Sequence, residues 1–62
     1  MTPALLHALL QLAGWEMCET LQRAHAHAET EPHLAGLYRA AHERSRRLYL
    51  ELRASLEAVN DA

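Results

Sequence analysis

The five residues ETEPH, at positions 29–33, decide the fold because they hold the strongest helix-breaking signal between two long helix-forming stretches. Pro32 has no backbone N–H and disfavours helical conformation at the residue before it. At the start of the chain, Thr2 followed by Pro3 is typical of a helix N-terminus. The sequence therefore predicts a single all-α domain, residues 1–62, folded as a two-helix antiparallel hairpin. Its predicted elements are a helix over 3–29, a turn at 30–32 and a helix over 33–60.

Each predicted helix carries a stripe of apolar and small side chains at alternating spacings of three and four residues, as in coiled coils. In the second helix the middle of the stripe is small, at Ala41 and Ser45, so a neighbouring helix is expected to approach closely there. These stripes are predicted to form the core of the hairpin and of its dimer. They comprise Leu6, Leu10, Ala13, Met17, Leu21, Ala24 and Ala28 in the first helix, and Leu34, Tyr38, Ala41, Ser45, Leu48, Leu52, Ser55 and Val59 in the second.

The first helix has a second apolar stripe that one partner helix cannot cover. Leu5, Leu9 and Leu12 lie well to one side of the first stripe, and Trp15 lies further round. A chain of 62 residues is too short to bury a large core without a disulfide, a metal or a partner chain. We therefore expect a homodimer that forms a four-helix bundle, with this second stripe contacting either the second copy or another protein. Trp15 is the anchor candidate, because interface hot spots are often tryptophan.

The composition is that of a helical protein from a reducing compartment. Alanine and leucine dominate, and Cys18 is the single cysteine, so an intramolecular disulfide is excluded. No apolar run is long enough to span a bilayer, and the N-terminus lacks the basic start and cleavage site of a signal peptide. We expect a cytoplasmic protein without membrane contacts or cofactors. The net charge of −2 provides no overall field for binding nucleic acid.

The five histidines raise the question of a metal site around the turn. His25 and His27 precede the turn and His33 follows it, but His-x-His spacing points two rings to opposite sides of a helix. Helical zinc pairs are instead four residues apart. We expect a polar turn without a metal ion, with metal binding and a pH response of these histidines as the alternatives. No catalytic constellation is present, since Cys18 has no activating partner and the Glu-x-x-His spacing of di-iron bundles is absent.

Arginines are concentrated in the segment HERSRR, residues 42–47. Arg44, Arg46 and Arg47 point to different sides of a helix, and Glu43 and Glu51 neutralise part of their charge. This pattern favours a solvated face or the arginine-rich rim of a protein interface over a phosphate-binding patch. Arg44 and Arg46, with Tyr49 close by, are therefore further candidates for binding a partner.

The whole chain resembles the Rop family of plasmid-encoded RNA-binding proteins. The shared positions in an alignment without gaps are Met1-Thr2, Ala8-Leu9, His42, Leu48-Tyr49 and Ala54, with the turn near residue 31. The resemblance implies an antiparallel four-helix bundle assembled from two hairpins. It does not extend to the family's RNA-binding lysine, asparagine, glutamine and aromatic residues. Pro3, Leu10, Gly14, Cys18 and His25 stand at those positions here.

The chain is also similar in type to small, all-helical, dimeric inhibitors from phages of GC-rich bacteria, anti-quorum-sensing proteins among them. Such proteins sequester host regulators through apolar helical faces. All six basic residues here are arginine, which is typical of a GC-rich genome. We predict a non-enzymatic homodimer that binds a protein as an inhibitor or regulator. The alternative is a Rop-like RNA- or DNA-binding dimer that uses the arginines of the second helix.

Overall fold

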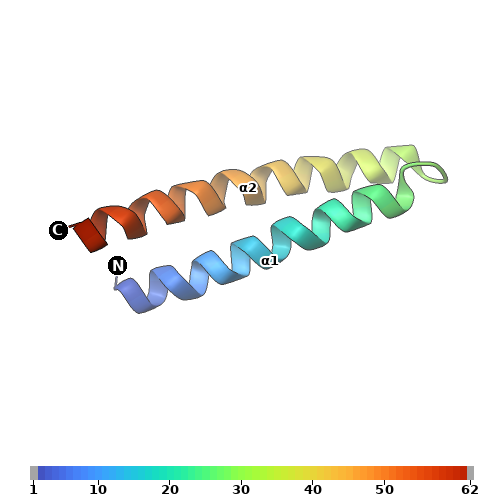
Figure 1. The fold of residues 1–62 in the computed structure, drawn as a ribbon. Helices are drawn as coiled ribbons and strands as arrows, with labels where there is room; N and C mark the ends of the chain where they lie inside the picture. The colour runs from blue at the N-terminus through green and yellow to red at the C-terminus, as the bar shows by residue number, and fades with distance from the viewer. Residues whose placement is uncertain (1, 62) are drawn as a thin grey trace.

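The computed structural model describes residues 2–61, which form two long antiparallel helices joined by a short turn (Figure 1). Helix α1 spans Pro3–His27 and helix α2 spans Pro32–Asp61. The hairpin is 48 Å long and only 14 by 13 Å across. The predicted all-α two-helix hairpin is confirmed. We call the end with residues 28–31 the turn end, and the end with both termini the open end.

The helix boundaries follow from the capping chemistry. The Oγ1 atom of Thr2 accepts a hydrogen bond from the backbone N–H of Leu5 at 3.2 Å, so Thr2 caps α1 as predicted. Helix α1 ends at His27, two residues earlier than predicted, and residues 28–30 form the turn. Helix α2 begins at Pro32, one residue earlier than predicted. Proline suits this position because the first N–H groups of a helix have no partner within the helix.

The two helices meet along a seam, meaning the residues of each helix that face the other. The hydrogen bond from the Nδ1–H of His42 to the carbonyl oxygen of Met17, at 2.8 Å, lies in this seam, and so does Tyr49, which packs beside Gly14. All seam residues are buried or half-buried, and their spacing alternates between three and four residues. They are Leu6, Leu10, Ala13, Met17, Thr20, Ala24 and His27 of α1, and Ala35, Tyr38, His42, Ser45, Tyr49, Leu52 and Leu56 of α2.

This seam differs from the predicted apolar stripes by one residue at several positions. Thr20 is buried in place of Leu21, which is 38% exposed. His42 and Tyr49 face α1 in place of Ala41 and Leu48, which flank the seam together with Leu34. The pattern allowed both alignments, because each keeps the same alternating spacing. The prediction pooled core and dimer residues, so the flanking positions stay candidates for contacts between copies.

The hairpin has a small interior. The buried apolar side chains are Leu6, Ala13, Ala24, Ala35 and Leu56. Three of these five are alanine, and within residues 2–61 no large side chain is completely enclosed. The accessible surface is 4643 Å², whereas a compact monomer of 7.0 kDa is expected to expose about 4,000 Å². The hairpin therefore exposes more surface than a compact chain of this size that folds alone.

Candidate partner-binding surfaces

One long side of the hairpin collects most of the flanking leucines. Each residue on this side immediately precedes a seam residue, and in an antiparallel helix pair the preceding positions of both helices lie on the same side. The hollow described below confirms this, because residues of both helices line it. We call this side the leucine face. Its apolar residues are Leu5, Leu9 and Leu12 of α1, and Leu34, Leu37, Ala41 and Leu48 of α2.

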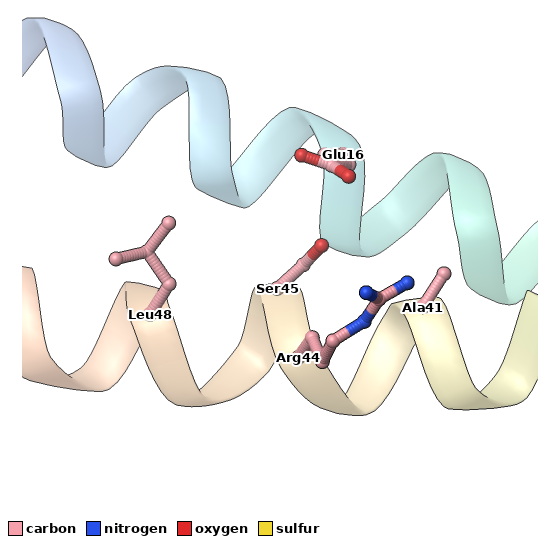
Figure 2. Close-up of a pocket in the computed structure, with 5 residues that line it drawn as sticks. All are labelled: Glu16, Ala41, Arg44, Ser45 and Leu48. Atoms are coloured by element: carbon pink, nitrogen blue, oxygen red, sulfur yellow. The ribbon is translucent and has the colours of Figure 1, made fainter.

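The middle of the leucine face is hollowed. Glu16, Ala41, Arg44, Ser45 and Leu48 line an open depression of about 260 Å³ (Figure 2). The small side chains of Ala41 and Ser45 leave this space open, and Ser45 is almost completely buried. Glu16 and Arg44 stand on its two sides, one on each helix. Within residues 2–61 neither of these two side chains forms an ion pair, so both charges remain available to another chain.

The opposite side of the hairpin carries few leucines, and its α2 residues are mostly charged. Its residues immediately follow seam residues, and we call it the arginine face. Arg46 lies 4.0 Å from Glu43, and Arg53 lies 3.3 Å from Glu57. Both pairs are well exposed, so each contributes little to stability. The arginine face comprises Arg39, Glu43, Arg46, Leu50, Arg53 and Glu57 of α2, with His7 and Leu21 of α1.

The outer side of α1 carries Trp15. The Trp15 side chain is 67% exposed and Leu12 is 64% exposed, the highest values among the large apolar residues described. At 100° per residue, Trp15 points almost directly away from α2. Leu12 lies one turn earlier, between Trp15 and the leucine face. The two side chains therefore form an apolar ridge on the outside of the hairpin, with the exposed Glu16 beside them.

The seven residues predicted to bind a partner do not form one surface. Leu5, Leu9 and Leu12 lie on the leucine face, where Arg44 lines the hollow. Trp15 points outward from α1, and Arg46 lies on the arginine face beside Glu43. Tyr49 is half-buried in the seam against Gly14. The single stripe that the sequence indicated on α1 thus divides into a leucine part, which shares a side with α2, and the outward Trp15.

The turn end holds a small cluster of rings. The rings of His27 and Tyr38 stack at a centroid distance of 5.7 Å and an interplanar angle of 11°. The guanidinium carbon of Arg23 lies 5.9 Å from the centre of the Tyr38 ring, and the Nδ1 atom of His27 lies 3.5 Å from a Glu31 oxygen. Across residues 2–61, no three His, Cys, Asp or Glu side chains gather as a metal site would require. These contacts join the ends of the two helices.

A polar group in the centre of the seam was not predicted. Thr20 donates from its Oγ1 atom to the carbonyl oxygens of Glu16, at 2.8 Å, and Met17, at 3.1 Å. The Met17 carbonyl also accepts from the Nδ1–H of His42. Sequence patterns rank Leu21 above Thr20 as a core residue, because they do not account for these hydrogen bonds to the helix backbone. The signal available was the position of Thr20, which continues the same spacing as Ala13 and Met17.

Comparisons with known proteins assign no family to this chain: no protein-family model, no curated protein and no solved structure gives a significant match. The likeness to Rop therefore extends no further than the two-helix hairpin. Neither α1 nor α2 has a stretch long and apolar enough to cross a membrane.

Proposed function

We propose that this chain is a small non-enzymatic protein that acts as a homodimer and binds a protein target as an inhibitor or regulator. The observation that carries the proposal is the excess of exposed apolar side chains on two different sides of one hairpin, the leucine face and the ridge of Leu12 and Trp15. A second copy of the chain can cover only one of these sides. The other side is then available to bind a protein target.

The ridge has the chemistry of a protein-binding site. Tryptophan supplies a large contact area, and hot-spot residues at protein interfaces are enriched in tryptophan and arginine. The ridge lies on a regular helix, so its residues are held in place before a target binds, which lowers the entropic cost of binding.

The proposal is tested in two steps with the purified chain. Sedimentation equilibrium should give a mass of about 14 kDa, twice 7.0 kDa, and the melting temperature should rise with protein concentration because folding is coupled to association. Trp15 fluorescence in that dimer should be that of a water-exposed indole and be quenched by iodide. A fully helical monomer at low micromolar concentration would contradict the dimer, and a shielded indole would contradict the ridge.

Target binding is then tested with a matched pair of variants. Trp15→Ala should keep the dimer and its helicity but lose a specifically captured protein, whereas Leu50→Ala, on the arginine face, should keep both. RNA or DNA binding by the second-helix arginines remains the alternative. It would show as capture of nucleic acid that weakens steeply with salt and is insensitive to Trp15→Ala. The ion pairs of Arg46 and Arg53 with neighbouring glutamates reduce the charge available for that role.

A further inference from the structure

We infer that the leucine face is covered by a second copy of this chain, packed with both turns at the same end of the bundle, so that Glu16 of each copy meets Arg44 of the other. This inference rests on the proposed homodimer and adds which face forms it and how the copies are oriented. It follows from the area of the face, the pairing of its charges and the placement of its leucines.

The area is sufficient for a stable dimer. The hairpin is 48 Å long and 14 Å wide. Two such faces in contact bury roughly 1,300 Å² in total, within the range of specific protein interfaces. The hollow lined by Ala41 and Ser45 lies near the middle of this area and lets the copies approach closely. The arginine face is less suitable, because it carries only two leucines, Leu21 and Leu50, against six on the leucine face.

Two symmetric arrangements bring leucine face onto leucine face. In the parallel arrangement the turns share one end, and α1 packs against α2 of the second copy. In the antiparallel arrangement the turns lie at opposite ends, and α1 packs against α1 of the second copy. Within one hairpin, Met17 is level with His42, and Gly14 is level with Tyr49. Glu16 is therefore level with Arg44, close to the midpoint of the hairpin.

Charge pairing separates the two arrangements. The parallel one places Glu16 opposite Arg44 of the second copy, twice by symmetry, and both groups lack an ion pair within the described hairpin. The antiparallel one, with the faces fully overlapping, places Glu16 opposite Glu16 of the second copy. Like charges facing each other at an interface are strongly unfavourable. The charges favour the parallel arrangement.

The leucines agree with the charges. In the parallel arrangement Leu12 lies opposite Leu48 of the second copy, and Leu9 lies opposite Glu51. In the antiparallel arrangement Leu12 lies opposite Glu19 of the second copy, and Leu48 opposite Arg44. Glu19 already forms an ion pair with Arg23 at 2.6 Å. The contact between Leu12 and Leu48, close to the centre of the face, forms only when the turns share an end.

The orientation is tested by a distance between two spin labels. Thr30→Cys in a Cys18→Ser background places one label at the turn of each copy, and both positions are exposed. Double electron–electron resonance measures the distance between the two labels. In the parallel arrangement this distance should not exceed the width of the bundle. A distance near 48 Å, the length of the hairpin, would overturn the parallel arrangement while leaving the homodimer intact. A monomeric protein would instead contradict the proposed dimer itself.

The charge pairing is tested by Glu16→Gln, a nearly isosteric change. In the parallel arrangement it removes two attractive contacts, so the dimer dissociation constant should rise about tenfold. In the antiparallel arrangement it relieves a repulsion and should tighten the dimer, which would overturn the inference. The matched control is Glu57→Gln on the arginine face, expected to leave the dissociation constant unchanged. Arg44→Gln should match the effect of Glu16→Gln, and combining the two should cost little more than either alone.

Discussion

The leucine face and the arginine face belong to the same two helices. Residues of the leucine face immediately precede seam residues, and residues of the arginine face immediately follow them. Positions just before the seam residues carry six leucines, whereas positions just after them carry only two, Leu21 and Leu50. On the arginine face, Arg46 and Arg53 form ion pairs with glutamates of the same chain. On the leucine face, Glu16 and Arg44 form no ion pair in the described hairpin. The difference indicates that one face is suited to water and the other to a second chain.

The largest expected effect comes from two leucines of α2 with almost equal exposure. Leu48, on the leucine face, is 48% exposed and Leu50, on the arginine face, is 44% exposed. If a second copy covers only the leucine face, Leu48→Gln should destabilise the dimer by about 2–4 kcal/mol, from lost apolar burial and a poorly solvated amide in each copy. Leu50→Gln should cost less than about 0.5 kcal/mol. Urea unfolding at one protein concentration measures both, and equal losses would remove the distinction between the faces.

A smaller effect is expected at the hollow. Ala41 lines its floor and is half-buried in the single chain. Ala41→Leu should overpack the close approach of the second copy and destabilise the protein by roughly 1–3 kcal/mol. Arg47→Ala, on the solvated outer side of α2, should cost well under about 1 kcal/mol. The melting temperatures of the two variants at matched concentration make the comparison. If Ala41→Leu were neutral or stabilising, the hollow would be open to solvent and not in contact with another chain.

The sequence was sufficient for the hairpin but not for the alignment of its seam. Thr2, Pro3 and Pro32 act locally through the backbone, so the helix limits could be predicted to within two residues. The seam depends on contacts between residues 25 positions apart, such as His42 with Met17. Hydrophobic spacing prefers Ala41 to a histidine at an inner position. The structure accommodates His42 there because the Met17 carbonyl oxygen accepts a hydrogen bond from the Nδ1–H of its ring.

The same reasoning explains the division of the candidate binding stripe. Leu5, Leu9, Leu12 and Trp15 could be recognised from the sequence as surplus apolar residues, because a hairpin covers only one stripe of each helix. Assigning them to separate surfaces required knowing on which side of the seam the leucines of α2 lie. That depends on the alignment of α2, in which Leu48 lies beside the seam and not within it.

The smallest expected effect comes from the two glycines, which both follow a seam residue and so lie away from the leucine face. A Cβ atom at Gly36 would meet only the Nη2 atom of Arg39, at 3.9 Å, whereas one at Gly14 would lie 3.4 Å from the Cε2 atom of Tyr49. We expect Gly36→Ala to stabilise the protein by about 0.5–1 kcal/mol, because alanine restricts the unfolded chain and suits a helix interior. Gly14→Ala should gain less, because the Tyr49 ring must shift slightly. Urea unfolding measures the gain, and sedimentation should show an unchanged dimer dissociation constant for both variants. Weaker association of the Gly36→Ala protein would mean that a second chain contacts the outer side of α2, and the leucine face would then not be the dimer interface.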